Sequence, residues 1–496
     1  MNSIINMRKG QGIFLGLLFL ITLFSFSCKK KETEAAELKV SSLQVIFESE
    51  GSSSDVSITS NVNWTATANI ALPWLTISQS SGVAGNVTLK LTTNANYTGA
   101  TREAIVTIKA PNGDARRIRI IQPNTIYASY NTSPKAPDAT GMSSTAVQLA
   151  AKMHMGMGIN FGNTMESPAE GDWQNSKLTE SYVRFVKQLG FNSVRIPCNW
   201  VWTHLSDPAK AKIDPAWLNR VKEVVGWCVA NDMYVILNAH SDMGWLDHNV
   251  NKASKDSVNA KQKAIWEQIA TTMRDFDEHL IFAGGNEPAA DDAEEMAILT
   301  SYHQTFINAV RATGGRNSYR VLVVSGPNTD ANLTFDLMNT LPVDPVPNRL
   351  MVEFHNYTPS TFTILTGGDA SWGKMAYYWG KGNQSVIEPD RNATWGDEDV
   401  ITAEFQKMKQ KFVDKGIPVV LGEYASWRRI AGLGNPVPKD TEMHNKSVEY
   451  WATYVTKQAK ANGLLPFWWE IGFMLDRANN VVKDQPMFDA IIAGYK

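Results

Sequence analysis

Two glutamates stand where apolar segments of the chain end. Glu287 lies in the sequence GNEP and Glu423 lies in LGEY, and each follows a run of apolar residues. Cleavage of a glycosidic bond needs two carboxyl groups, one ionised beside the anomeric carbon and one that protonates the leaving oxygen. A single glutamate at such a place is commonly a solvated loop carboxylate. The pair, with both members at the ends of apolar runs, predicts an acid and nucleophile that work together.

Polar and aromatic side chains end the neighbouring apolar runs as well. An arginine and a tyrosine beside one of the two glutamates would keep that carboxylate charged. The negative charge of this carboxylate would raise the pKa of the other glutamate. Chance exposure could explain one or two such residues but explains the whole set poorly. The set consists of Arg195, His240, Asn286, His355, Tyr357 and Trp469.

Eight short apolar runs alternate with longer amphipathic stretches and would position these residues. One stretch, 178–189, has apolar residues near helical spacing and ends at Gly190. Eight βα units in about 350 residues predict a (β/α)8 TIM barrel, whose active sites lie at the carboxyl ends of the strands. Runs four and seven lie roughly opposite in such a ring, so their glutamates can approach to about 5 Å, the distance of retaining enzymes. The runs are 155–163, 193–197, 234–240, 280–288, 319–327, 349–357, 418–426 and 464–472.

A doubly wound sheet is the alternative architecture. It would need a glycine-rich phosphate-binding turn after the first strand. Gly156 and Gly158 lie within the first run instead. The barrel, expected over 144–496, is therefore the prediction.

The segment 36–123 has a different texture, with short alternating strands such as VTLKL at 87–91 and RIRII at 117–121. The sequence PNGD at 111–114 signals a hairpin, and the pattern predicts an immunoglobulin-like β-sandwich. Trp64 and Trp74 could be ligand platforms, although buried sandwich tryptophans are commoner, so we expect a spacer domain. A linker is expected over 124–143, where Pro134 and Pro137 interrupt any periodic pattern.

The N-terminus predicts a signal peptide over 1–28. Arg8 and Lys9 precede an apolar run, 13–26, that is too short for a confident membrane span. The run ends at Cys28, which three lysines follow, and this resembles a bacterial lipoprotein signal with Cys28 lipidated. Ser25 replaces the usual leucine, and an ordinary signal peptide is the alternative. We expect a secreted protein, lipid-anchored at the outer membrane on either its surface or its periplasmic face.

The composition and the absence of certain motifs limit the classes of partner and of enzyme that fit this chain. A net charge of −2 over 496 residues offers no electrostatic footprint for nucleic acid. The first run of the barrel has no histidine and the chain has no Gly-x-Ser-x-Gly, so neither a metal-dependent nor a serine hydrolase is favoured. Cys198 and Cys228 are expected as free buried thiols. We expect no cofactor, a polysaccharide or oligosaccharide substrate, and a monomer.

The barrel segment resembles glycoside hydrolase family 5, a family of retaining enzymes, from Gly156 to Trp469. The motifs NEP and GEY carry the resemblance, together with the set above in the same order. The resemblance implies that Glu287 is the acid/base and Glu423 the nucleophile, and that Asn286 binds the sugar 2-hydroxyl. Its further implications are that Arg195 and His240 order the nucleophile, that His355 and Tyr357 hold the geometry, and that Trp469 is a stacking floor. The segment 36–123 resembles the BACON domain of Bacteroidetes enzymes.

The sequences GINFGNT at 158–164 and IFAGG at 281–285 resemble the endo-β-glucanase branch of the family. In that branch Asn163, and with it Glu166, would touch substrate. Ser241 replaces a frequent second histidine and Glu470 a frequent aspartate. We expect tryptophans that include Trp245 and Trp379 to line an open cleft for an internal segment of a plant β-glucan. An endo-β-1,4-mannanase and a non-catalytic glycan-binding lipoprotein are the alternatives.

Overall fold

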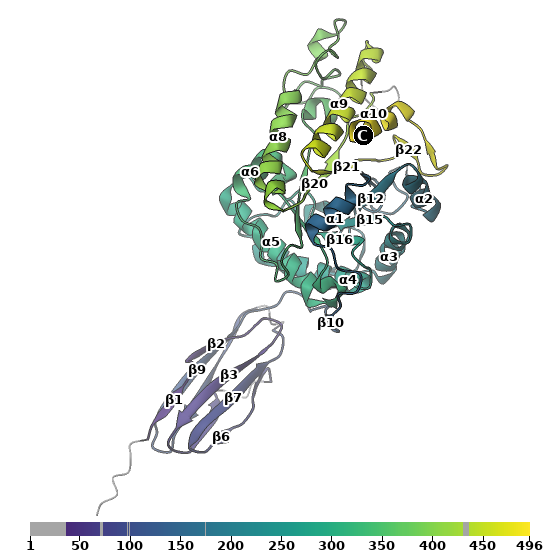
Figure 1. Cartoon of the computed structure of the whole chain (residues 1–496). Coiled ribbons are helices and arrows are strands. Elements are labelled where there is room, and N and C mark those ends of the chain that lie inside the picture. Colours follow the sequence, from purple (N-terminus) through teal and green to yellow (C-terminus); the bar gives the residue numbers. More distant parts are fainter. Residues whose placement is uncertain (1–35, 70–72, 97, 99, 174, 430–435) are drawn as a thin grey trace, which may run out of the picture. The chain divides into compact units, whose positions relative to one another are not determined.

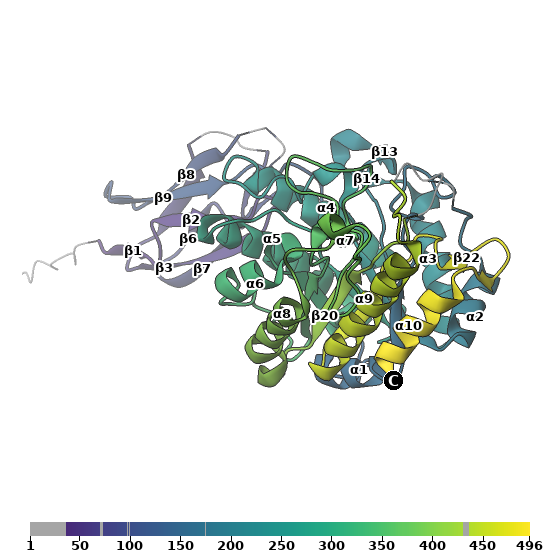
Figure 2. The ribbon, with the colours of Figure 1, turned by 90° about the horizontal axis from the view of Figure 1, so that it is seen from above.

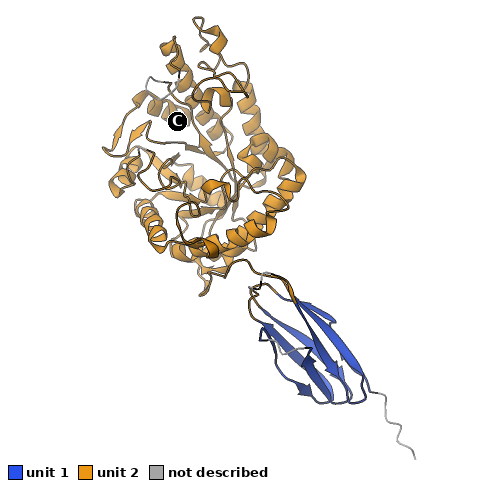
Figure 3. Ribbon diagram, turned by 180° about the vertical axis from the view of Figure 1, so that it is seen from behind, with its two compact units in different colours: residues 1–47, 52–93, 103–121 blue, residues 48–51, 94–102, 122–496 orange. Residues whose placement is uncertain are grey.

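The structure is a computed structural model that describes residues 36–69, 73–96, 98, 100–173, 175–429 and 436–496. The predicted signal peptide and Cys28 lie outside the described residues. The chain forms two compact units, a small unit within 36–121 and a large one that contains 122–496 (Figure 3). Among the described residues, no helix combines the length and the apolarity that a bilayer crossing requires.

The small unit is a β-sandwich, as predicted. Its strands alternate buried and exposed side chains, which is the pattern of a sheet with one face on a core. Trp64 is only 1% exposed and packs within that core, and Trp74 is half-buried against it. Trp64 is therefore a packing residue and offers no ring face to a ligand. One sheet has the order β1-β3-β7-β5 (Leu38–Val40, Ser53–Ser60, Gly85–Thr93, Leu75–Ile77) and the other β2-β9-β8-β4-β6 (Gln44–Ile46, Ala115–Gln122, Arg102–Lys109, Trp64–Ala68, Ser81–Gly82).

The large unit is the predicted TIM barrel, with eight parallel strands closed into a ring (Figure 1). Every strand falls within or across one of the apolar runs of the sequence. In ring order the strands are β11 (Met157–Asn160), β12 (Phe191–Ile196), β15 (Tyr234–Asn238), β16 (Leu280–Ala283), β18 (Leu322–Ser325), β19 (Leu350–His355), β20 (Val419–Tyr424) and β21 (Leu465–Trp468).

Helices surround the ring. The predicted helix over 178–189 is α2 (Glu180–Gln188), which begins where Thr179 caps the backbone N–H of Tyr182. Figure 2 shows the last two helices, α9 (Thr441–Ala461) and α10 (Gln485–Tyr495), side by side, and Thr453 donates to the Ala490 carbonyl between them. The others are α1 (Ala146–Met153), α3 (Pro215–Ala230), α4 (Lys255–Met273), α5 (Ala293–Ala312), α6 (Ala331–Leu337), α7 (Ser360–Thr363) and α8 (Glu398–Lys411), with short hairpins β13–β14 (Leu205–Asp207, Lys212–Ile213) and β22–β23 (Leu475–Asp476, Val481–Val482).

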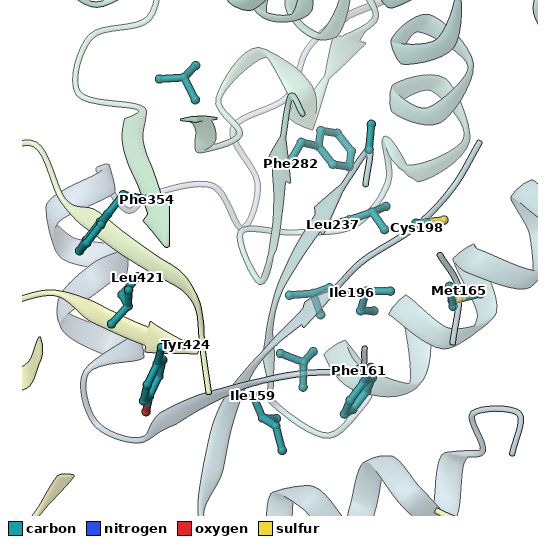
Figure 4. Close-up of a cluster of buried hydrophobic side chains, with 14 of the residues drawn as sticks. Ile159, Phe161, Met165, Ile196, Cys198, Leu237, Phe282, Phe354, Leu421 and Tyr424 are labelled. Carbon is teal, nitrogen blue, oxygen red and sulfur yellow. The ribbon is translucent and has the colours of Figure 1, made fainter. Parts of the chain in front are cut away.

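Side chains of the barrel strands form two apolar layers, because successive side chains of a strand point to opposite faces of the sheet. Residues such as Ile236 and Val323 pack with Leu149 of α1, so α1 belongs to the inner layer. Alternate residues, among them Leu237 and Phe354, belong to the outer layer beneath the helices (Figure 4). Both layers are nearly free of exposed atoms, which gives the strand ends a rigid base.

The predicted linker is part of the barrel unit. Strand β10 (Lys135–Pro137) pairs with β17 (Gly314–Gly315), and the backbone N–H of Tyr130 donates to Glu267 over 2.6 Å. The Asn131 side chain donates to the Ala312 carbonyl over 2.8 Å. Sequence reasoning missed this because non-periodic polar chain can still be tied down by side chains more than a hundred residues away. Cys198 and Cys228 are free and buried, as expected.

Candidate active site

Arg195 organises the carboxyl ends of the barrel strands. Its side chain is fully buried, and its guanidinium forms one ion pair with Glu423 and another with Glu353, each at 2.8 Å. It also donates to Asn286 over 2.7 Å and to Asn160 over 3.1 Å. Arg195 lies beside Asn160 in the register of β11 and β12, so the barrel itself fixes where the guanidinium points. The predicted role of Arg195 on the Glu423 side agrees with this geometry.

The two predicted glutamates face each other. One carboxylate oxygen of Glu287 and one of Glu423 lie within 4.8 Å of each other, and both lie within 4.8 Å of a His355 nitrogen. Such a close approach favours the roughly 5–5.5 Å separation of the carboxyl groups in retaining glycosidases over the roughly 6.5–9.5 Å of inverting ones. The Glu423 side chain is 6% exposed, whereas that of Glu287 is 44% exposed. Glu423 is therefore at the floor of the site, and Glu287 reaches toward solvent.

Different partners hold the two carboxylates. Glu423 accepts from Arg195 on one oxygen and from the Tyr357 hydroxyl, 3.0 Å away, on the other. Burial raises the pKa of Tyr357, so its hydroxyl stays a donor. Glu287 is bonded to His355 Nδ1 at 2.7 Å. A carboxylate held by two such donors has the fixed orientation of a nucleophile, and one at the solvent side with a single histidine suits proton exchange.

A third carboxylate, Glu353, was not singled out from the sequence. It is fully buried, 3.1 Å from His355 Nε2, and ion-paired with Arg195. A Cβ atom on Gly422 would lie 2.1 Å from the Glu353 carboxylate, so only glycine fits before Glu423. The available signal was a charged residue at an inward position of an apolar strand, two residues before His355.

Charges in this group compensate one another. Burial lowers the pKa of His355, but Glu423, Glu287 and Glu353 outweigh burial and raise it to about 10, so His355 is a cation. Burial raises the pKa of Glu423, and Arg195 and His355 oppose that rise. Burial raises the pKa of Glu287, but the hydrogen bond and charge of His355 outweigh burial and lower it, so the expectation of a raised pKa for the acid glutamate is wrong. In the resting site the proton is therefore on His355, which donates to the Glu287 carboxylate over 2.7 Å.

This proton gives a pH dependence of stability. Because the pKa of His355 in the folded protein, about 10, exceeds its ordinary value of 6.5, the stabilising effect of its charge is complete below about pH 6.5 and is lost as the pH rises through 10. We expect the wild type to lose stability over that window with an extra slope of at most about 1.4 kcal/mol per pH unit relative to His355→Gln. Urea unfolding of both proteins from pH 6 to 10 measures the difference. Parallel curves would contradict the assigned charge.

The remaining predicted residues surround the pair. His240 stacks on Trp469 with ring centroids 5.5 Å apart, and its Nδ1 lies 3.9 Å from Glu423. Burial, Arg195 and His355 lower the pKa of His240, so it is neutral there. Asn286 donates to Ser241 over 3.3 Å. Trp469 is half-buried and keeps part of its ring open as a stacking surface.

Two acidic residues near the site support loops. Glu166 is 6% exposed and accepts from the backbone N–H groups of Asn163 and Thr164, so the expectation that it touches substrate is wrong. Glu470 is fully buried and accepts from the backbone of Gly472 and two following residues. Asn163, by contrast, is half-buried and lines an open cavity of about 850 Å³ at the strand ends.

The tryptophans divide into packing residues and exposed ones. Trp379 is 1% exposed and donates to the Gly396 carbonyl, so the expectation that Trp379 lines the cleft is wrong. The position of a ring in a long insertion depends on packing partners that the local sequence does not reveal. Trp245 is half-buried and donates to Asp242 over 3.1 Å. Trp202 is 37% and Trp372 56% exposed.

Asp242 is a second residue that sequence reasoning missed. The backbone from Ser241 to Gly244 has four consecutive positive φ angles, a conformation that costs non-glycine residues free energy. The buried Asp242 carboxylate compensates by accepting from the backbone N–H groups of Trp200 and two following residues and from Trp245. This turn fixes Ser241 beside Asn286. No sequence motif indicates this turn.

The same atoms also have a spacing that could suit a metal ion. Among the described residues, the group whose spacing could suit an ion is Glu287, His355 and Glu423. These atoms already bond to one another and to Arg195 and Tyr357. The donor set fits an acid–nucleophile pair.

A TIM barrel with paired glutamates at this spacing defines a retaining glycoside hydrolase. Residues 156–474 match glycosyl hydrolase family 5, described as cellulase, and residues 37–123 match a domain described as the viral BACON domain. The chain belongs to glycoside hydrolase family 5 and carries a BACON-type domain before the barrel.

Named relatives cover either nearly the whole chain or 71% of it. A xyloglucan-specific endo-β-1,4-glucanase of Bacteroides ovatus is 32% identical over 96% of this chain and 95% of its own length. The solved Bacteroides ovatus family 5 xyloglucanase bound to a heptasaccharide has a TM-score of 0.66 and 30% identity, covering 93% of this chain and 100% of that one. A xyloglucan-specific β-1,4-glucanase from a ruminal metagenomic library has a TM-score of 0.63 and 35% identity, covering 71% and 96%. The predicted class, an endo-β-1,4-glucanase, is confirmed.

Proposed function

We propose that the chain cleaves internal β-1,4 bonds of xyloglucan and related plant β-glucans with retention of configuration. The observation that carries this proposal is the pair of facing carboxylates, Glu287 and Glu423, within 4.8 Å and with unequal exposure. The relatives named above as xyloglucan-specific support xyloglucan as the preferred polymer. Asn286 and Trp469 bind the reacting sugar by its 2-hydroxyl and by its apolar face.

The first step forms a glycosyl ester. A Glu423 oxygen attacks the anomeric carbon as the bond from that carbon to the leaving oxygen breaks, and Glu287 gives its proton to that oxygen. A sugar bound at the strand ends excludes water from Glu287 and so lowers the polarity around it. The lower polarity disfavours the charged pair of Glu287 and His355, so the proton moves from His355 to Glu287 and leaves both groups neutral. Arg195 and Tyr357 keep Glu423 ionised and aimed.

The second step reverses the roles. Glu287, now a carboxylate, takes a proton from a water molecule that attacks the anomeric carbon, and the ester bond to Glu423 breaks. Two inversions at the same carbon restore the original configuration. The exposed position of Glu287 gives that water access, while Glu423 remains covered.

Activity on a panel of polymers tests the proposal. We expect release of reducing ends from tamarind xyloglucan, barley β-glucan and carboxymethylcellulose, fastest from xyloglucan, with mid-length oligosaccharides as the early products. Release from mannan alone would favour the mannanase alternative. Tight binding to a polymer without cleavage of any would identify a glycan-binding protein and overturn the proposal.

We also propose that the chain is exported and lipid-anchored at the outer membrane through Cys28. The support is the basic and apolar N-terminal pattern that ends at Cys28 before three lysines. Radiolabelled palmitate should enter the wild type expressed in a bacterium that processes lipoproteins and should not enter Cys28→Ser. Equal labelling of both, or of neither, would contradict the anchor.

A further inference from the structure

A cavity of about 610 Å³ lies in the barrel unit, and none of its lining residues belongs to the catalytic group. It lies among the insertion at 356–397 and the helices α8 and α9. Its size is within the roughly 300–1,000 Å³ of small-molecule sites. Its lining includes Trp379, Trp395, Tyr450 and Tyr454.

Hydrogen bonds between three elements build its wall. Glu398, the first residue of α8, accepts on Oε1 from the backbone N–H of Lys381 over 2.7 Å and from the Tyr450 hydroxyl over 3.1 Å. The Tyr454 hydroxyl donates to the Glu398 carbonyl over 3.0 Å. Gly380 has φ +96, and a Cβ atom there would lie 2.5 Å from the Tyr450 ring, so glycine is required. The wall is therefore held in place before any ligand arrives.

The floor and the rim differ in chemistry. Trp379 is 1% exposed and packs on Tyr450 and Tyr454, so it is the support beneath the cavity. Trp395 is 47% exposed and is the ring that a ligand can cover. Asp397 and Asp399 are exposed on the same lining.

These features select a neutral, hydroxyl-rich ligand. A flat aromatic ring binds the apolar face of a pyranose, and carboxylates accept hydrogen bonds from its hydroxyl groups. Asp397, Glu398 and Asp399 outnumber the single lysine of the lining, Lys381, which disfavours an anionic ligand. The polymer substrate is much longer than the few sugars that the catalytic residues contact, so other parts of the same polymer chain remain free to bind elsewhere on the enzyme.

We propose that this cavity is a second glycan-binding site on the barrel, for a segment of the β-glucan that is being hydrolysed, with Trp395 as its stacking platform. The proposal rests on the proposed function for the identity of the polymer. Two sites on one enzyme that hold one polymer chain raise the apparent affinity, because the second contact is intramolecular.

The test separates polymer binding from catalysis. Retardation in native gels containing tamarind xyloglucan or barley β-glucan is measured for full-length Glu423→Gln, which binds without cleaving, and for the same protein with Trp395→Ala. We expect Trp395→Ala to weaken polymer binding roughly tenfold, which corresponds to about 1.4 kcal/mol. In the enzyme that keeps Glu423, Trp395→Ala should leave kcat/KM on a short aryl β-cellobioside within about twofold of wild type, since that substrate occupies only the catalytic site.

Val386→Ala is the matched control, because Val386 is 92% exposed on the same insertion and does not line the cavity. It should leave both readouts unchanged. Unchanged polymer retardation with Trp395→Ala would overturn the second site. An equal fall in binding and in aryl cellobioside hydrolysis would also overturn it, by placing Trp395 in the catalytic cleft. Failure of the wild type to cleave any polymer would instead reject the proposed function, whatever the gels show.

Discussion

Glu423→Gln is expected to lower kcat/KM on xyloglucan by roughly 10⁴-fold or more, the scale seen when a residue of covalent catalysis is removed. Glutamine keeps the shape of the side chain, and its single carbonyl oxygen can still accept from one of the two donors, Arg195 at 2.8 Å or the Tyr357 hydroxyl at 3.0 Å. It removes the charge that attacks the anomeric carbon. Steady-state release of reducing ends measures the loss.

Glu278→Gln is the matched control for this variant. Glu278 is also a buried glutamate, and it bonds Ser144 and Lys152 just before the start of strand β16, away from the carboxyl ends of the strands. Its substitution should leave kcat/KM within about threefold of wild type once the protein is folded, because no transition-state contact is lost. Similar large losses in both variants would mean that charge removal acts through folding.

Azide distinguishes the two glutamates. With an activated aryl glycoside, Glu423→Gly should be rescued by azide to give an α-glycosyl azide, because a single displacement inverts the anomeric carbon. Glu287→Gly still forms the glycosyl ester, and azide should then give the β-glycosyl azide. The opposite anomers would exchange the two assignments.

Glu353→Gln should have the second largest effect, acting on stability as well as on activity. Glu353 is fully buried, and its carboxylate contacts Arg195 at 2.8 Å and His355 at 3.1 Å. Removing one partner of a buried ion pair leaves an uncompensated charge and costs about 3–5 kcal/mol. Urea unfolding should show this loss.

Glu353→Gln is also expected to lower kcat, because Glu353 positions two side chains of the active site. Without Glu353, Arg195 and His355 lose a shared anchor, so kcat should fall more than KM rises. The exposed pair of Arg119 and Glu103 in the sandwich gives the contrast, since Glu103→Gln should change neither stability nor activity measurably. A Glu353→Gln protein as stable as wild type would contradict the coupling of the buried charges.

Much of this molecule could be predicted from local sequence. Period-two and apolar patterns placed the sandwich and all eight barrel strands, because each strand buries its own residues against layers that every barrel has. Strand ends then gave the catalytic set, since the fold brings them to one edge. Arg195, His355, Tyr357 and both glutamates accordingly lie together.

The residues that the sequence did not predict correctly are those whose positions depend on packing against other parts of the fold. Trp379 reads as a cleft residue but is covered by Tyr450 and Tyr454, seventy or more residues later. Glu166 reads as a substrate contact but caps its own loop. Glu353 reads as one more strand residue until Arg195, on another strand, shows why a charge is buried there. No local pattern contains these partners.

Trapping of the covalent intermediate tests the central claim most directly. An aryl 2-deoxy-2-fluoro-β-cellobioside slows the second step, so the glycosyl ester accumulates on the nucleophile and peptide mass spectrometry can locate it. We expect one fluorinated cellobiosyl group per chain, on the peptide that contains Glu423, with loss of activity in step with labelling. A label on Glu287, or inactivation without a covalent label, would contradict the retaining mechanism with Glu423 as nucleophile.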